Sequence, residues 1–260
     1  MVPTTDSTDQ PIGDFYDALA QDYDQMTSFE TRLVSERPFV RLLVEKHSIA
    51  SALDAGSGSG FHSVLLAQLG VRVTAVDLSN VMLGALARHA ATKGLSVRVL
   101  QASFRDLPSR FHEVVDGVFC MGNALAHLLD SRELEAALTA FRKVIRPGGS
   151  LVLQVLNYDR ILAERQRIQS VREAGGATFV RFYDYHNDHL VFNVVKLEHR
   201  EAGVEQHALA IPLKPWTSNE LAHALVRAGF QDVELFGSIA LEQFAAASSK
   251  DLVIHTRVPS

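Results

Sequence analysis

The chain has 260 residues, of which 47% are hydrophobic, and a net charge of −5 at pH 7. That is room for one α/β domain with an insertion, or for two small domains. The charge excludes a basic nucleic-acid surface, no apolar run reaches the ~18 residues of a membrane span, and a single cysteine, Cys120, excludes an internal disulfide.

The N-terminus is polar and unlike a signal peptide, so a cytoplasmic protein is expected. Residues 1–13 predict a loose tail, and apolar spacing predicts helices at 14–26 and 33–46. Strand and helix patterns then alternate, with strands at 50–55, 71–76, 97–102, 114–121 and 150–155 and helices at 61–69, 79–93 and 132–145. Pro147-Gly148-Gly149 predicts a turn before the last of these strands. The alternation predicts a parallel sheet with helices on both faces.

The pattern changes after Asn157. Residues 178–185, 189–200 and 204–213 alternate like strands and predict an antiparallel meander. A helix at 218–228 and strands at 231–236 and 251–256 then complete the main sheet. We therefore predict one domain at residues 14–260, with an antiparallel β lid inserted at about 158–216.

A glycine-rich turn follows the first of the alternating strands. Gly56, Gly58 and Gly60 alternate there, whereas dinucleotide-binding turns carry Gly-x-Gly-x-x-Gly and this chain has Phe61 at the last position. Asp54 precedes the turn and would repel a pyrophosphate. S-adenosylmethionine (SAM) has a sulfonium, an ammonium group and a ribose but no phosphate, so it suits this turn better. A tight strand-to-helix turn without a ligand is the alternative.

Further polar groups follow the next strands, at the sheet edge where such folds bind ligands. Asp77 ends the second strand, where a carboxylate can hold a ribose diol. Ser103 and Phe104 follow the third strand, where they can hydrogen-bond and cover an adenine ring. Phe104 is equally well interpreted as a core residue.

The glycine turn resembles the first motif of class I SAM-dependent methyltransferases. The segments 15–26, 120–128 and 157–159 resemble the glycine/sarcosine N-methyltransferases and their small-molecule relatives, although Ala124 stands where that family has serine. The resemblance extends from about Phe15 to Val258. It implies a Rossmann-like fold, a mostly parallel seven-stranded sheet with the inserted lid, and SAM as cofactor.

The resemblance also implies the site residues. The predicted cofactor-binding residues are Tyr23, Arg32, Asp54, Gly56, Gly58, Gly60, Asp77, Ser103, Phe104, Met121 and His127. The predicted substrate-binding residues are Tyr16, Asn123, Leu156, Tyr158 and Tyr183. Asn123 and Tyr23 are the predicted catalytic residues, and Asn123 is expected to face the substrate amine.

One position departs from the family. Its glycine enzymes carry an arginine directly before Asn-Tyr-Asp, where it pairs with the substrate carboxylate, and this chain has Leu156. A buried carboxylate without a cation is costly. The acceptor is therefore expected to lack a carboxylate or to place it elsewhere, against Arg160 or Arg181. Both arginines are otherwise ordinary surface or ion-pair residues.

The predicted activity is methyl transfer from SAM to the nitrogen of a small-molecule acceptor by in-line displacement. The alternatives are a small-molecule O-methyltransferase, with His127 or His186 as base, and a SAM-binding protein without catalysis. A nicotinamide oxidoreductase is disfavoured by Asp54 and Phe61. No metal site is predicted, and the expected partners are the acceptor and, as in some relatives, further copies of the chain.

Overall fold

The computed structural model describes residues 9–201 and 203–260. Its main sheet has seven strands in the order β10-β11-β5-β4-β1-β2-β3. The strands are β1 (Ser51–Ala55), β2 (Arg72–Asp77), β3 (Arg98–Gln101), β4 (Val115–Cys120), β5 (Ile145–Leu156), β10 (Gln231–Phe236) and β11 (Asp251–Arg257). Only β11 runs antiparallel to its neighbours, β5 and β10. The predicted mostly parallel seven-stranded sheet is confirmed.

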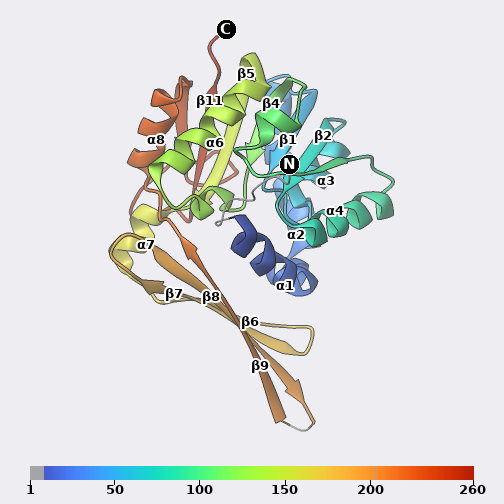
Figure 1. Cartoon of the computed structure of the whole chain (residues 1–260), viewed down its shortest axis with the longest axis vertical. Helices are drawn as coiled ribbons and strands as arrows, with labels where there is room; N and C mark the ends of the chain where they lie inside the picture. Colours follow the sequence, from blue (N-terminus) through green and yellow to red (C-terminus); the bar gives the residue numbers. More distant parts are fainter. Residues whose placement is uncertain (1–8, 202) are drawn as a thin grey trace, which may run out of the picture.

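Helices cover both faces of this sheet (Figure 1). They are α1 (Asp9–Thr27), α2 (Phe29–Lys46), α3 (Phe61–Gln68), α4 (Asn80–Thr92), α5 (Leu107–Arg110), α6 (Ser131–Val144), α7 (Tyr158–Glu164) and α8 (Ser218–Arg227), with a short 3₁₀ helix, η1, at Ala124–His127. None of these helices, which lie within residues 9–201 and 203–260, is long and apolar enough to cross a membrane.

Two hydrophobic cores lie on the two faces of the sheet. Leu53 and Leu151 point into one core, with side chains of α1, α6 and α8. Ala52, Phe119 and Val152 point into the other, with side chains of α2 and α3. Because successive strand residues face opposite sides and both sides are buried, the central strands are apolar throughout their length. This explains why their sequences gave clear strand signals.

The lid is a second, antiparallel sheet in the order β6-β7-β8-β9, preceded in the chain by α7. Its strands are β6 (Ile168–Ala174), β7 (Ala177–Tyr185), β8 (Leu190–Arg200) and β9 (Gly203–Leu213). It projects away from the main sheet, and α1 lies between the two (Figure 1). The predicted three-stranded meander is confirmed, but β6 was missed. Its large apolar side chains, Ile168 and Val171, are exposed, so only pairing with β7 defines this strand.

Two local predictions are wrong. Residues 9–13 form the first turns of α1 instead of a loose tail, and residues 1–8 lie outside the described residues. The turn predicted at Pro147-Gly148-Gly149 lies within β5. There the pairing with β4 shifts register, from Val115 opposite Ile145 to Gly117 opposite Ser150. The extra residues on one strand form a bulge, which accommodates a proline and two glycines inside a sheet.

Candidate active site

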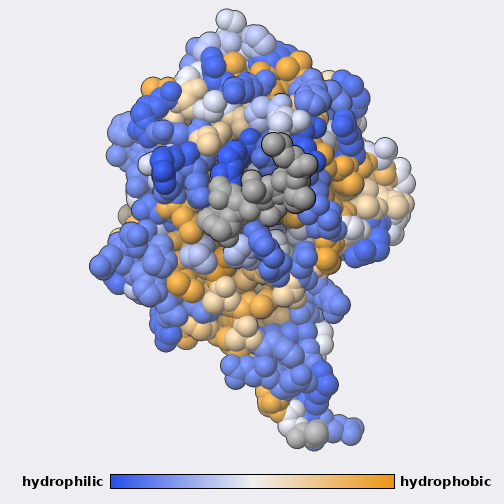
Figure 2. All heavy atoms as spheres, viewed as in Figure 1, coloured by the Kyte–Doolittle hydropathy of each residue, from blue (hydrophilic) through white to orange (hydrophobic). Residues whose placement is uncertain are grey.

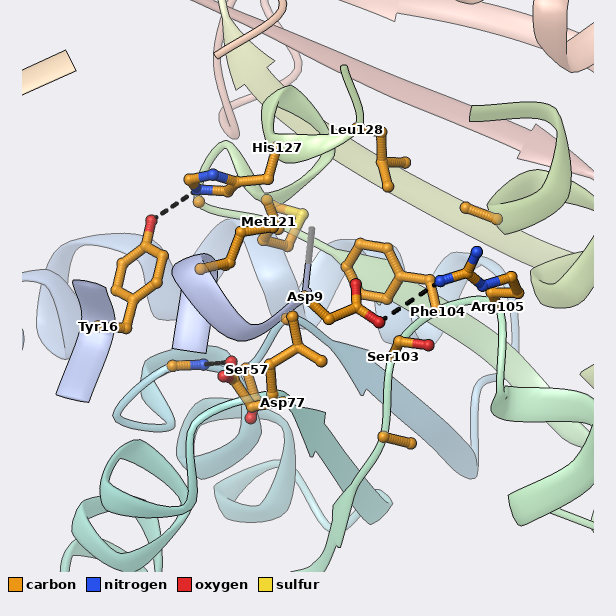
Figure 3. Close-up of a pocket in the computed structure, with 18 of the residues that line it drawn as sticks. Asp9, Tyr16, Ser57, Asp77, Ser103, Phe104, Arg105, Met121, His127 and Leu128 are labelled. Carbon is orange, nitrogen blue, oxygen red and sulfur yellow. Dashed lines mark hydrogen bonds and ion pairs between the residues drawn. The ribbon is translucent and has the colours of Figure 1, made fainter. Parts of the chain in front are cut away.

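A cavity of about 420 Å³ opens at the carboxyl ends of β1, β2, β3 and β4. The turn after β1, the end of β2, and the segments after β3 and β4 all contribute side chains that point into it (Figure 3). Helix α1 covers it with Tyr16 and Tyr23. The volume lies in the range of small-ligand sites, and the position beside β1 and β4 is where the strand order of the sheet reverses.

Most of the predicted cofactor residues meet in this cavity. Its lining includes Tyr23, Arg32, Gly56, Gly58, Asp77, Ser103, Phe104, Met121 and His127, together with Tyr16 from the predicted substrate set. Asp54, Gly60, Asn123, Leu156, Tyr158 and Tyr183 do not line it. The structure thus separates the predicted residues into a cavity and a set of positions beneath or beside it.

The glycine turn is tied to the end of β2. The Gly58 amide donates to Asp77 Oδ2 (2.8 Å) and the Ser79 amide donates to Asp77 Oδ1 (2.9 Å). These bonds hold the carboxylate in one orientation at the cavity wall, and burial raises the pKa of Asp77. A Cβ at Gly56 would lie 2.7 Å from Ala124 Cβ, so a side chain there would collide with the opposite wall. Gly56 therefore keeps the cavity open.

Asp54 and Gly60, which were predicted to bind the cofactor, lie under the turn and not in the cavity wall. Asp54 is 1% exposed and accepts a hydrogen bond from Ser63 Oγ of α3 (2.6 Å), and burial raises its pKa. Gly60 has φ +92°, and a Cβ there would lie 2.3 Å from Leu86 Cγ of α4. Both residues shape the turn from below and pack it on α3 and α4.

One end of the cavity carries a fixed cation. Arg32 Nε donates to Glu36 Oε1 (2.7 Å), and the guanidinium lies 4.1 Å from the centroid of the Phe61 ring. Phe61 and His62 line the cavity beside it and were not predicted as site residues. The signal was available for Phe61, which occupies the position where a dinucleotide-binding turn has glycine.

The opposite wall also contains residues that the sequence analysis missed. Asp9 and Ile12 line the cavity from the first turns of α1, and Arg105 forms an ion pair with Asp9 (3.5 Å; Figure 3). The segment after η1 adds Leu128 and Asp130. Asp9 and Ile12 lie within residues 1–13, for which the sequence predicts a loose tail. Their contribution depends on α1 folding over the sheet, which no local pattern predicts.

His127 of η1 and Tyr16 of α1 form a partly buried pair in the cavity wall. The Tyr16 hydroxyl lies 2.9 Å from His127 Nε2 (Figure 3). Burial lowers the pKa of His127 to about 4, so its imidazole is neutral at pH 7, and burial raises the pKa of Tyr16. Among the described residues, nothing hydrogen-bonds to the buried His127 Nδ1 or to Ser57 Oγ. Two polar atoms in the cavity wall thus lack protein partners.

Asn123 holds a second buried polar cluster next to the cavity. Its Nδ2 donates to the Tyr158 hydroxyl (2.8 Å), and its Oδ1 accepts from the Leu156 amide (3.1 Å). The Tyr158 and Tyr183 hydroxyls also interact, and both side chains are 0–2% exposed. The predicted substrate residues other than Tyr16 therefore lie together, but Asn123 already has two protein partners.

The His127 pKa predicts a pH-dependent stability. The folded value of about 4 lies below the ordinary 6.5, so the unfolded chain binds more protons between these values. Stability is full above pH 6.5 and falls as the pH drops toward 4. Between pH 7.5 and 5, the free energy of unfolding of the cofactor-free protein should therefore decrease. We expect this decrease, measured by urea denaturation, to be about 2 kcal/mol smaller in His127→Gln than in the unchanged protein.

Burial also lowers the pKa of His47 to about 4. His47 therefore contributes the same loss of stability on acidification to both proteins, and this contribution cancels in the comparison. Equal losses on acidification in the two proteins would contradict the assignment of a depressed pKa to His127.

Among the described residues, one group has the spacing of metal ligands: Glu198, Glu205 and His207 on the lid. Arg200 Nη2 lies 2.7 Å from Glu198 and 2.9 Å from Glu205, and Lys196 also pairs with Glu198. Hydrophilic residues cover most of the far end of the lid in the view of Figure 2. Because cations of the chain already neutralise both carboxylates, this group is a surface ion-pair network.

The cavity has the features that SAM requires. Arg32 supplies a cation for a carboxylate, Asp77 supplies an oriented acceptor for ribose hydroxyls, and Ser103 with Phe104 supplies a hydroxyl and an aromatic ring. The unpartnered His127 Nδ1 and Ser57 Oγ offer further hydrogen bonds to a bound molecule. The donor and acceptor groups of the cavity therefore fit this cofactor.

Comparison with known proteins agrees with this geometry. Residues 52–149 match a family model described as "Methyltransferase domain". A glycine/sarcosine N-methyltransferase of Aphanothece halophytica is 26% identical over 230 residues, covering 88% of this chain and 84% of that protein. Another, of Parasynechococcus marenigrum, is 32% identical over 155 residues, covering 60% of this chain and 55% of that protein, so the matched region spans about half its length.

Among solved structures, an S-adenosylmethionine-dependent methyltransferase from Clostridium acetobutylicum superposes with a TM-score of 0.80 at 13% identity. The superposition covers 94% of this chain and 99% of that structure. Residues 52–149 are therefore similar to a methyltransferase domain, and the whole chain has the fold of an S-adenosylmethionine-dependent methyltransferase.

Proposed function

We propose that the chain transfers a methyl group from SAM to the nitrogen of a small-molecule acceptor. The observation that carries nitrogen over oxygen is the weak basicity of the polar groups around the cavity. The pKa of His127 is lowered to about 4, and the pKa values of Tyr16 and Tyr23 are raised. A hydroxyl acceptor needs a base to take its proton, whereas a neutral amine carries its own lone pair. The relatives named glycine/sarcosine N-methyltransferase support the same reaction.

Different residues of the cavity would bind different parts of SAM. Tyr23 and Arg32 would hold the amino-acid part of SAM, Asp77 the ribose, and Ser103 with Phe104 the adenine. When bound, SAM supplies an electrophilic methyl group on a sulfonium. The Gly56 and Gly58 backbone lets the ligand approach the turn closely, because no side chain projects there.

The acceptor would lie on the side of Tyr16, Tyr158 and Tyr183. These phenols have pKa values raised by burial, so they stay protonated and act as neutral hydrogen-bonding groups. Asn123 would act through Tyr158, whose hydroxyl it holds at 2.8 Å, and so it is better described as a positioning residue than as a catalytic one. Helix α1 and the lid would exclude water, which favours transfer by proximity and alignment.

The test is release of S-adenosylhomocysteine from SAM with a panel of acceptors. The panel contains glycine, sarcosine, dimethylglycine, aminosugars, simple amines and small phenols, with mass spectrometry locating the new methyl group. We expect turnover of one or more amines and methylation at nitrogen. Methylation only at oxygen would support the O-methyltransferase alternative. Tight SAM binding without any turnover would support a SAM-binding protein without catalysis. A protein that does not bind SAM would refute all three hypotheses.

A further inference from the structure

Three cationic side chains, Arg172, Arg181 and Lys196, lie on the face of the lid that contains Phe179. In β6 and β7, Ser170 lies opposite Arg181 and Arg172 lies opposite Phe179. In β7 and β8, Phe179 lies opposite Lys196. Directly opposed residues and residues two apart share a face of a sheet. Arg172, Arg181 and Lys196 therefore share the face of Phe179, whose 2% exposure shows that this face packs against the rest of the molecule.

Two of the three cations are bound to the segment that contains α1. Lys196 Nζ pairs with Asp22 Oδ2 (2.9 Å), and Arg172 Nη1 donates to the Met26 carbonyl (3.1 Å) and to Ser28 Oγ (2.6 Å). Arg181 differs from both. Its Nε donates to Ser170 Oγ (2.7 Å) on its own sheet, and in the described part of the chain no carboxylate forms an ion pair with it.

The surroundings of Arg181 point to the acceptor side of the site. Its guanidinium interacts electrostatically with the phenols of Tyr23 and Tyr183. Tyr23 lines the cofactor cavity and Tyr183 belongs to the buried cluster beside it, but Arg181 itself does not line the cavity. Arg32 already supplies a cation within that cavity. An anion that pairs with Arg181 therefore lies on the side of Tyr183, outside the space assigned to SAM.

We propose that Arg181 binds a carboxylate group of the acceptor. A partly buried guanidinium with one hydrogen bond leaves most of its donors unpaired, and its planar fork matches a carboxylate in two parallel bonds. This inference rests on the proposed function and narrows its acceptor to amino acids or other amines that carry a carboxylate. Arg181 would thus replace the arginine that the glycine enzymes carry at the position of Leu156.

The binding test uses the full chain saturated with S-adenosylhomocysteine, with acetate and its neutral isostere acetamide as probes, followed by ligand-detected NMR. We expect the unchanged protein to bind acetate more tightly than acetamide. Arg181→Met should weaken acetate binding by about 10- to 100-fold and leave acetamide binding unchanged. Arg181→Lys keeps the charge without the planar fork, so its affinity for acetate should lie between those of the unchanged protein and Arg181→Met.

Arg167→Met is the matched control. Arg167 pairs with Asp184 (2.7 Å) on the opposite face of the lid and is 66% exposed, so this variant removes the same charge without touching the face of Phe179. It should bind acetate as the unchanged protein does. Thermal unfolding of each variant with and without S-adenosylhomocysteine establishes that it is folded.

Three results would overturn the proposal. They are equal binding of acetate and acetamide by the unchanged protein, unchanged acetate binding by Arg181→Met, and a loss of SAM affinity in Arg181→Met, which would place the cofactor's own carboxylate at Arg181. Preference for acetate that depends on Arg181 would support the proposal even if no acceptor released S-adenosylhomocysteine. That combination would refute the proposed transferase activity alone.

Discussion

Replacement of Asp77 by alanine is expected to weaken SAM binding by about 100-fold or more. The carboxylate lines the cavity, and backbone bonds from Gly58 and Ser79 fix its orientation. Its free lone pairs are placed to accept from two ribose hydroxyls, and hydrogen bonds to a charged group are each worth about 1.5–3 kcal/mol. Isothermal titration calorimetry of the purified full chain with SAM measures the effect.

Two further variants give this prediction its controls. Asp77→Asn keeps the shape and one acceptor oxygen, so it should lose less affinity than Asp77→Ala while retaining more of the turn. Asp184→Ala removes an equal charge from the outer face of the lid, where Asp184 pairs with Arg167, and should leave SAM affinity unchanged. A dissociation constant for Asp77→Ala within about threefold of the original would show that Asp77 does not hold the ribose.

Replacement of Gly60 by alanine should lower the free energy of unfolding by about 2 to 5 kcal/mol. Two costs contribute. The backbone has φ +92°, which costs a residue with a Cβ about 1–2 kcal/mol. The new Cβ would also lie 2.3 Å from Cγ of Leu86, a side chain that is 0% exposed and cannot move aside, and overpacking of this kind costs about 1–3 kcal/mol.

Gly70→Ala separates these two costs. Gly70 has φ +84°, close to that of Gly60, but a Cβ there would meet nothing within 4 Å. Urea denaturation of the three proteins, with equal m-values as the check on two-state behaviour, should show a smaller loss for Gly70→Ala. Equal losses would mean that α4 accommodates the extra methyl group and that Gly60 is required only for its backbone conformation.

The residues of the glycine turn and the adjoining strand ends fall into two groups, which differ in what they contact. Gly56, Gly58 and Asp77 face the ligand, whereas Asp54 and Gly60 face the protein and hold the turn on α3 and α4. Variants of the first kind should affect SAM affinity more than stability. Variants of the second kind should affect stability first, and affinity only through the shape of the turn.

The sequence by itself determined the main sheet and the position of its ligand site. Strands buried on both faces are apolar throughout, and helices that cover a sheet have apolar residues every three to four positions. Parallel strands bring their carboxyl ends to one edge of the sheet. Gly56, Asp77 and Ser103 line the cavity, as their positions after strands predicted, and Met121, which the family resemblance implied, lines it too. The resemblance to a known family added Tyr23, Arg32 and His127, which no local pattern identifies.

Only the tertiary structure decided which polar groups meet. Tyr16 and His127 are 111 residues apart in the chain, and Asn123 and Tyr158 are 35 apart, so no periodicity connects them. The edge strand β6 exists because β7 pairs with it. The sequence does not distinguish Arg181 from the other arginines of the lid. The packing of the lid on α1 gives partners to Arg172 and Lys196, whereas no carboxylate among the described residues forms an ion pair with Arg181. Local pattern depends on near neighbours in the chain, whereas the pairing of buried polar groups depends on contacts that form only when distant segments pack together.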